Sequence, residues 1–199
     1  RNIKKKKIEI LDFGSGSGTN LNMLSQFGKV YAYEPHKPTQ KYLKLKFKNK
    51  KFNIISSIGK KKFDLIVLAD VLEHLKNDKR EIKNLSRKLK KNGKFLITVP
   101  AFQLLFTKKD KILGHYRRYT LTELISIFKS YKKIKISYFN FFLFFPISII
   151  LIFCKITNYD FIDQVEKKPS YFVNTILTYI FLFENKLINF LNFPFGISI

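Results

Sequence analysis

The chain has 199 residues, which is enough for one domain with a buried core and a small appendage. It contains 38 Lys and Arg residues and 14 Asp and Glu residues, which gives a formal net charge of +24. Its one Cys excludes an internal disulfide framework and a cysteine-based zinc site. Only 5 of the 38 basic residues are Arg, the residue that phosphate and base readers use most. We therefore interpret most of the charge as a solvated Lys surface, with attraction to anionic lipid or nucleic acid as the alternative.

Charge and aromatic residues are distributed unevenly along the chain. Residues 1–135 hold 34 basic and 10 acidic side chains, whereas residues 136–199 hold four of each and 13 of the 22 Phe. The chain does not begin with Met and ends on a strand-like run, so we expect truncation at both ends. The expected parts are a core at 1–139, a Phe-rich helical cap or membrane-interface insertion at 140–192, and the last strand of the core sheet at 193–199.

Strands and helices alternate over most of the sequence. The predicted strands are Ile8–Phe13, Lys29–Glu34, Phe52–Ile55, Phe63–Ala69, Lys94–Val99 and Ile134–Phe139. The predicted helices are Thr19–Phe27, Pro38–Lys50, Asp78–Lys91 with a stop at Asn92-Gly93, and one opened by a Thr120–Glu123 capping box and running to about Ser130. Several strands lack polar alternation, which is typical of a parallel sheet covered by helices on both faces. The pattern predicts an α/β fold with ligands bound beyond the carboxyl ends of the strands.

The first strand runs into a glycine loop, "EILDFGSGSGTNL". Loops of this kind let a ligand approach the backbone at the start of a helix. The spacing of Gly14, Gly16 and Gly18 differs from the dinucleotide fingerprint, which would place its third glycine at Thr19. A carboxylate at Glu34, at the end of the second strand, suits two ribose hydroxyls and would serve either kind of cofactor. The spacing therefore disfavours a dinucleotide oxidoreductase.

An acidic residue, Asp12, lies two positions before the first glycine. This D-x-G-x-G-x-G pattern resembles the first motif of class I S-adenosylmethionine-dependent methyltransferases, of the type 11 and 12 kind. The stretches "FDLIVLADVLEHL" and "KNGKFLITVPA" are similar to that family's fourth and fifth strands. The resemblance implies a Rossmann-like methyltransferase fold with S-adenosyl-L-methionine as cofactor. The cofactor-binding residues that it implies are Asp12, Gly14, Ser15, Gly16, Gly18, Glu34, Pro35, Asp70, Val71 and Leu72.

A second informative stretch is "DKILGHYRRYT", which resembles a G-H-x-R-R-Y signature of a bacterial subgroup of these methyltransferases. His115 is a candidate general base, because histidine titrates near neutral pH, and Arg117 and Arg118 could clamp an anionic acceptor. In the alternative interpretation, His115 bonds to backbone and the arginines pair with surface carboxylates. His74 is a competing base or a structural brace. No metal site is predicted.

The last third of the chain contains two uncharged runs, Phe141–Cys154 and Tyr171–Phe183. Both are shorter than a membrane span usually requires. A helical cap over the active site, an interfacial helix pair and a true span all remain open. The first two imply a bulky, hydrophobic or lipid-like acceptor, and the segment Phe193–Ile199 is expected to close the sheet.

Taken together, the sequence predicts a methyltransferase that acts on the oxygen of a hydrophobic or lipid-linked acceptor. We expect a cytoplasmic protein associated with the inner face of the membrane, through peripheral contact with anionic lipid, and no nucleic-acid or metal partner. Three alternatives remain: an RNA methyltransferase or RNA-binding module, a dinucleotide oxidoreductase, and a catalytically silent lipid-surface protein.

Overall fold

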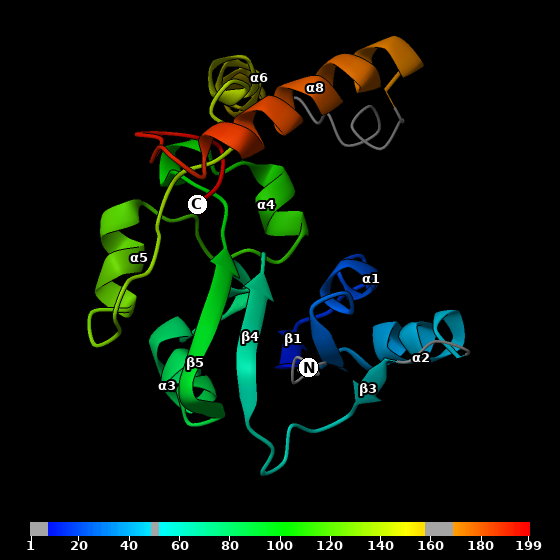
Figure 1. Ribbon diagram of the computed structural model, residues 1–199. Coiled ribbons are helices and arrows are strands. Elements are labelled where there is room, and N and C mark those ends of the chain that lie inside the picture. Colours follow the sequence, from blue (N-terminus) through cyan, green and yellow to red (C-terminus); the bar gives the residue numbers. More distant parts are fainter. Residues whose placement is uncertain (1–7, 49–51, 158–168) are drawn as a thin grey trace, which may run out of the picture. The chain divides into compact units, whose positions relative to one another are not determined.

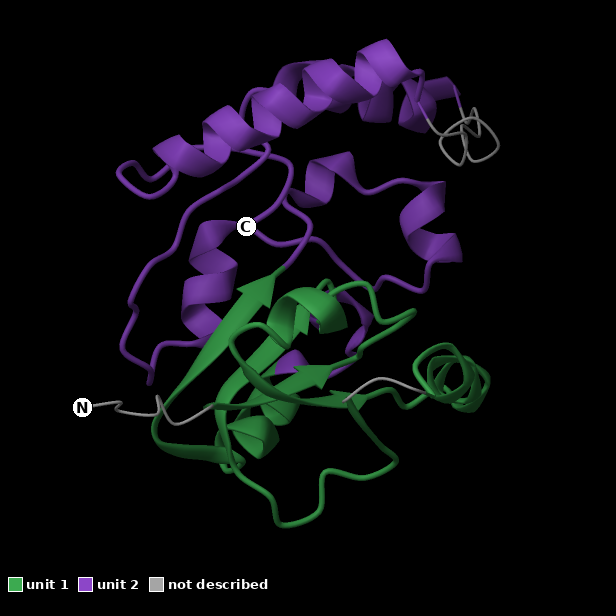
Figure 2. Cartoon of the chain, turned by 45° about the vertical axis from the view of Figure 1, so that its right-hand side comes forward, with its two compact units in different colours: residues 1–71, 79–98 green, residues 72–78, 99–199 purple. Residues whose placement is uncertain are grey.

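The chain forms two compact units. The computed structural model describes residues 8–48, 52–157 and 169–199. One unit comprises residues 1–71 and 79–98, and the other residues 72–78 and 99–199 (Figure 2). In the second unit, Val99 and Ala101 hydrogen-bond to Ile199 and Ile197 of the C-terminal segment.

In the described residues, the first unit contains a five-stranded parallel sheet (Figure 1). The strand order is β3-β2-β1-β4-β5, and every neighbouring pair is parallel. The strands are β1 (Ile8–Phe13), β2 (Gly28–Tyr33), β3 (Asn53–Ile55), β4 (Phe63–Ala69) and β5 (Leu89–Thr98). This sheet confirms the predicted α/β, Rossmann-like fold class.

Helices connect the strands of this sheet. They are α1 (Leu21–Leu24), α2 (Lys37–Lys46) and α3 (Asp78–Ser86). The chain moves outward from β1 to β3 and then returns to build β4 and β5 on the other side of β1. Right-handed crossovers therefore place α1 and α2 on one face and α3 on the opposite face. The reversal between β1 and β4 is the switch point at which such sheets bind ligands.

A buried apolar cluster fixes α1 and α2 against the sheet. It joins Ile10 and Val30 of the strands to Leu21, Leu43 and Phe47, all at most 5% exposed. The helix predicted over Thr19–Phe27 is shorter in the structure and covers only Leu21–Leu24. The end of the predicted Pro38–Lys50 helix lies outside the described residues.

The predicted boundary between the third long helix and the fifth strand is wrong. Helix α3 ends at Ser86, and β5 begins at Leu89, where it pairs with Phe63. Asn92 and Gly93 do not stop a helix, since they lie inside β5 at a shift in its register with β4. Asn92 has a φ of 65°, so the asparagine that suggested a helix end supplies an irregularity within a strand.

The second unit is mainly helical. Its elements are the 3₁₀ turns η1 (Leu72–His74) and η2 (Gln103–Leu105) and the helices α4 (Lys108–Ile112), α5 (Leu121–Ile127), α6 (Phe144–Thr157) and α8 (Tyr171–Leu187). The Thr120–Glu123 capping box at the start of α5 is confirmed, with each side chain bonded to the other residue's backbone N–H. The two uncharged runs form α6 and α8, as the sequence predicts.

Two predicted strands of the sheet are not strands in the structure. Ile134–Phe139 and Phe193–Ile199 contribute only isolated antiparallel bridges, in which Tyr138 pairs with Phe193 and Phe139 with Ser198. These segments pair with one another, and Ser198 also bridges to Pro100 beyond the end of β5. The aromatic side chains of this region pack by stacking on one another instead of extending the sheet. The rings of Phe141 and Phe193, for example, stack with 4.8 Å between their centroids.

Helices α6 and α8 leave many apolar side chains exposed. Ile149, Phe153 and Ile156 of α6 are 55–75% exposed, and Tyr171 and Phe172 of α8 are 73–89% exposed. Among the described residues, no helix has the length and apolar character that crossing a membrane requires.

Candidate active site

The glycine loop after β1 is held to the neighbouring strand β2. The backbone N–H groups of Gly14 and Ser15 both donate to the carbonyl oxygen of Tyr33, at 2.8 and 3.0 Å. The Ser15 hydroxyl donates to the backbone oxygen of Asp12 at 2.8 Å, which folds the loop back on its own strand. The loop is thus fixed at the switch point of the sheet before any ligand binds.

The three glycines of this loop have different surroundings. Gly14, Gly16 and Gly18 all have positive φ, which disfavours other residues. A Cβ on Gly14 would lie 2.8 Å from a methyl carbon of Val71, and one on Gly18 would lie 2.5 Å from the ring of Phe47. Apart from its two chain neighbours, no atom of the described residues lies within 4 Å of a Cβ built on Gly16, so the space above this residue is open. Two glycines serve packing, and the third leaves room for a ligand.

Glu34 connects the glycine loop to the end of β2. Its Oε2 accepts the N–H of Gly16 at 2.9 Å, and its Oε1 accepts the N–H of His36 at 2.9 Å. The residue is 8% exposed. Each carboxylate oxygen has a second lone pair, so the carboxylate keeps capacity for two ligand hydroxyls. Pro35 follows it as an exposed residue.

Asp12 is a buried acid at the end of β1. It is 2% exposed, and its Oδ2 makes no hydrogen bond to another described residue. Burial raises the pKa of Asp12 to about 6; the nearby Ser15 hydroxyl opposes the shift, and the charge of Glu34 adds to it. A buried carboxyl with a free oxygen atom fits a polar or cationic ligand held at the loop.

The loop after β4 meets the glycine loop from the other side of β1. Asp70 has a φ of 54°, an uncommon conformation for a residue other than glycine, and its carboxyl accepts a hydrogen bond from the Thr98 hydroxyl at 3.2 Å. Val71 contacts Gly14. Eight of the predicted cofactor-binding residues thus lie in the first unit at one edge of the sheet: Asp12, Gly14, Ser15, Gly16, Gly18, Glu34, Asp70 and Val71. Leu72, the next residue, begins the second unit.

His115 lies in the second unit, just after α4. Gly114 precedes it with a φ of 79°, so the chain turns sharply after the helix. The backbone N–H of His115 donates to the carbonyl of Asp110 at 2.8 Å, and its Nδ1 lies 2.9 Å from Asp110 Oδ1. The His74 ring stands edge-on to the His115 ring, with 4.6 Å between centroids. The two candidate bases are neighbours.

Arg118 pairs with the same carboxylate. Its Nε and Nη2 lie 3.0 Å from the two oxygens of Asp110, and the Thr107 backbone N–H donates to Oδ2 at 2.8 Å. Burial alone would raise the pKa of Asp110, but the hydrogen bonds from Arg118 and Thr107 and the Arg118 charge outweigh it and lower the pKa. Asp110 is therefore an ionised acceptor, and His115 Nδ1 carries the hydrogen.

Arg117 and Tyr119 connect the same loop to Asp78. Arg117 Nη1 lies 3.4 Å from Asp78 Oδ2, and its Nη2 donates to the Lys76 carbonyl at 3.0 Å. The Tyr119 hydroxyl donates to Asp78 at 2.9 Å. Burial, and then this hydrogen bond, raise the pKa of Tyr119 above its ordinary value. Both arginines thus bind carboxylates of the chain, but Asp110 and Asp78 are buried and are not the surface carboxylates of the alternative interpretation.

Sequence reasoning missed Asp110 as the residue that orients His115 and Arg118. The available signal was the capping box of Thr107 and Asp110 at the start of α4, five residues before His115. It also left Glu73 without a role, although its side chain lies beside His74 and His115.

Comparisons with known proteins identify the family and the fold of the chain. Residues 1–132 match the model of a methyltransferase domain family, which is two thirds of the chain. The chain therefore belongs to this family of methyltransferase domains. A comparison with curated protein sequences found no significant match.

Solved structures show the same fold at low sequence identity. YcgJ from Bacillus subtilis is 16% identical with a TM-score of 0.56, over 65% of this chain and 64% of that protein. The plantazolicin methyltransferase BpumL, solved in complex with SAH, is 20% identical with a TM-score of 0.52, over 64% and 56%. An S-adenosylmethionine-dependent methyltransferase from Mesorhizobium loti is 12% identical with a TM-score of 0.51, over 61% and 72%. The match thus spans less than two thirds of the first two proteins.

Proposed function

We propose that the protein is an S-adenosylmethionine-dependent methyltransferase and that the glycine loop of the first unit holds the cofactor. One observation carries the proposal: Glu34 binds the Gly16 N–H at 2.9 Å while the space above Gly16 is open. A nucleoside can therefore lie against bare backbone with a carboxylate beside it. Family membership over residues 1–132 supports the same function.

The residues of the loop fit the parts of this cofactor. Glu34 retains lone pairs for two ribose hydroxyls. Asp12 offers a buried carboxyl whose pKa burial raises to about 6, and a cationic group of the ligand would favour its ionised form. Pro35, Asp70, Val71 and Leu72 complete the set, at the ends of β2 and β4. When bound, the cofactor supplies a methyl group on a positively charged sulfur, which needs no further activation.

We propose His115 as the group that prepares the acceptor. With Asp110 fixing the hydrogen on Nδ1, the Nε2 atom is free to take the proton of an acceptor hydroxyl. This arrangement supports transfer to oxygen. Arg118 is nearly buried and holds Asp110, whereas the Arg117 side chain is 36% exposed and is the better placed of the two to meet an anionic acceptor.

The acceptor that we propose is hydrophobic or lipid-linked. The protein would bind it at an anionic membrane surface. Helices α6 and α8 lie outside the residues matched to the family and expose large apolar side chains, including Phe153 and Phe172. Exposed apolar area of this kind marks a surface for an apolar partner. The net charge of +24 adds attraction to anionic headgroups.

Calorimetry with S-adenosylhomocysteine and with NADH tests the cofactor. We expect binding of S-adenosylhomocysteine by the wild-type protein and none of NADH. Gly16→Ala places a methyl group in the open space and should weaken binding at least tenfold. Tight NADH binding without S-adenosylhomocysteine binding would overturn the proposal.

Gly59→Ala is a matched control for this variant. Gly59 has a φ of 56°, against 50° for Gly16, and a Cβ on it would also meet no atom within 4 Å. Both changes carry the same backbone cost, about 1 kcal/mol of folding stability. Only the change at Gly16 should weaken S-adenosylhomocysteine binding. If both variants lose the same affinity for S-adenosylhomocysteine, the cause is reduced folding stability and not the loss of ligand space.

A further inference from the structure

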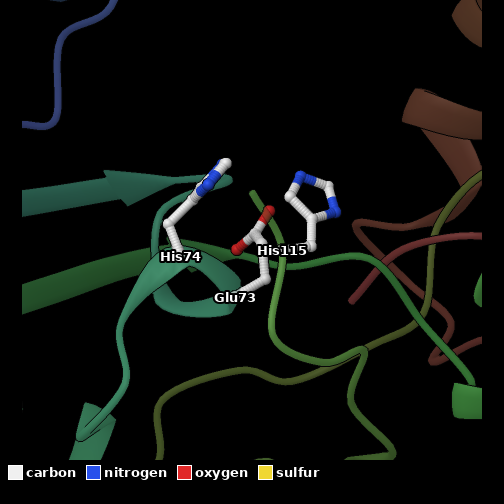
Figure 3. A group of neighbouring side chains, drawn as sticks. All are labelled: Glu73, His74 and His115. Atoms are coloured by element: carbon white, nitrogen blue, oxygen red, sulfur yellow. The ribbon is translucent and has the colours of Figure 1, made fainter. Parts of the chain in front are cut away.

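Glu73, His74 and His115 form a cluster of potential metal ligands in the second unit. One ligand atom from each residue lies within 4.8 Å of the other two. Figure 3 shows the Glu73 carboxyl group directed toward the space between the two imidazole rings. Two imidazole nitrogens and a carboxylate oxygen are a ligand set that holds zinc in catalytic sites.

The backbone fixes both sides of this cluster. Glu73 and His74 belong to η1, whose first residue, Leu72, is fully buried. The Tyr116 N–H donates to the Glu73 carbonyl at 2.7 Å, which joins η1 directly to the loop that carries His115. The Tyr119 hydroxyl lies 3.1 Å from the Leu72 carbonyl oxygen. The three side chains therefore come from two segments that are bonded to one another.

Asp110 prepares His115 as a ligand. A carboxylate oxygen of Asp110 lies 2.9 Å from Nδ1 as a hydrogen-bond acceptor, so the ring hydrogen is on Nδ1 and the lone pair is on Nε2. A carboxylate on the other ring nitrogen is the usual support of a metal-binding histidine, because it fixes the ring and raises its basicity. Arg118 and Thr107 hold Asp110 in turn.

Burial and exposure in the cluster suit a cation. Glu73 is fully buried, and a low dielectric strengthens the attraction of a carboxylate for a cation. His74 is exposed, so an ion can enter from solvent. Metal–ligand bonds of about 2.1 Å place tetrahedral ligand atoms about 3.4 Å apart. A change in the side-chain torsion angles of His74 would bring the ligand atoms, which now lie within 4.8 Å of one another, to that separation.

We propose that Glu73, His74 and His115 bind one divalent first-row transition metal ion, with Zn²⁺ as the best match. This replaces the expectation, made from the sequence, that the protein has no metal. Three protein ligands leave a coordination position for an oxygen atom. The metal site stands on these residues alone, whereas its role rests on the proposed function. There it would bind the acceptor hydroxyl and lower its pKa, so that the hydroxyl proton passes to water. Ligation of the metal by His115 Nε2 is an alternative to the base role proposed above, because one lone pair cannot serve both.

Metal binding by the untagged full chain tests the proposal. Calorimetry with Zn²⁺, and the visible spectrum of the protein with Co²⁺, should show one ion per chain. His74→Ala and His115→Ala should each weaken binding at least a hundredfold, and Asp110→Asn by 10–100-fold through the lost support of His115. Glu73→Gln keeps the shape of the buried side chain and should also weaken binding.

His36→Ala is the matched control. His36 is the one histidine of the chain outside the cluster, lies exposed in the first unit and contacts Thr39. This variant should bind Zn²⁺ as the wild type does. Equal Zn²⁺ binding by the His36 and His74 variants, or no binding by a folded wild-type protein, would overturn the site. S-adenosylhomocysteine calorimetry on the same samples separates this result from failure of the proposed function.

Discussion

Asp12 shows how a single residue at the end of β1 combines a structural cost with the cofactor-binding role that we propose. Its carboxyl is buried beside Glu34, so ionisation is unfavourable in the folded protein. The position follows from β1, which carries Asp12 to the edge of the sheet in register with Ala32 of β2. The sequence pattern located this acid, but the raised pKa depends on how deeply the surrounding chain buries it.

The raised pKa predicts a fall in stability as pH rises. The folded protein keeps the Asp12 proton up to a pKa of about 6, while the unfolded chain loses it near 3.8. Between these values the folded state binds more protons, so the free energy of unfolding should fall by about 3 kcal/mol. Urea unfolding of the wild type and of Asp12→Asn, at pH values between the two pKa values, measures this change in the free energy of unfolding. The variant should not lose stability over this pH range.

Asp64→Asn provides a control of opposite sign. The Glu9 N–H and then Lys90 lower the pKa of Asp64, so its contribution is present above its unfolded pKa and is lost as pH falls. If the Asp12 variant follows the same pH profile as the wild type, the Asp12 pKa is not raised.

At the scale of elements, a buried carboxylate of α8 organises the segment before α6. Glu184 is 4% exposed, and its carboxylate accepts hydrogen bonds from the backbone N–H groups of Asn140 and Phe142. Asn140 has a φ of 59°, so the chain turns there. The sequence predicted both apolar helices from their composition, but it gave no indication that a charged residue of one would hold the start of the other.

Replacement of Glu184 should therefore destabilise the second unit. Glu184→Ala removes the acceptor of two backbone N–H groups and should lower the free energy of unfolding by about 1–3 kcal/mol. Glu184→Gln keeps an acceptor oxygen and should cost less. Chemical denaturation followed by circular dichroism measures both. Lys186→Ala, an exposed change on the same helix, should have no effect, and equal losses for all three variants would contradict the assigned role.

At the scale of the whole molecule, charge and apolar surface lie in different parts of the sequence. The excess of Lys precedes residue 135, and the exposed Ile and Phe side chains of α6 and α8 lie beyond it. A protein that combines the two features can bind an anionic membrane surface by attraction and shallow insertion. A nucleic-acid partner would use the basic residues alone.

Vesicle flotation distinguishes these partners. The wild type should float with anionic vesicles more than with neutral ones, and salt should reduce binding without abolishing it. Phe153→Ser with Phe172→Ser should lower the partition coefficient at least tenfold, because each Phe loses its apolar burial.

Phe27→Ser with Leu45→Ser removes two side chains that are 64–67% exposed in the first unit and should leave flotation unchanged. Flotation that is unaffected by the α6 and α8 changes, or RNA binding tighter than vesicle binding, would contradict membrane contact and favour the RNA alternative.

The sequence by itself determined the parallel sheet, the glycine loop with Glu34, the capping box at Thr120 and the two apolar helices. These features depend on local hydrophobic periodicity and on residues with intrinsic backbone preferences, so they can be predicted from the sequence alone. Where a local signal competed with pairing, as at Asn92-Gly93, the contact of Leu89 with Phe63 prevailed over the turn preference.

Only the tertiary structure decided what the second unit does with its polar residues. The bond of Arg117 to Asp78 and the grouping of Glu73 with the two histidines join segments that are separate in the chain. Burial and hydrogen-bond geometry arise from how the backbone brings such segments together. No pattern along the sequence specifies that arrangement.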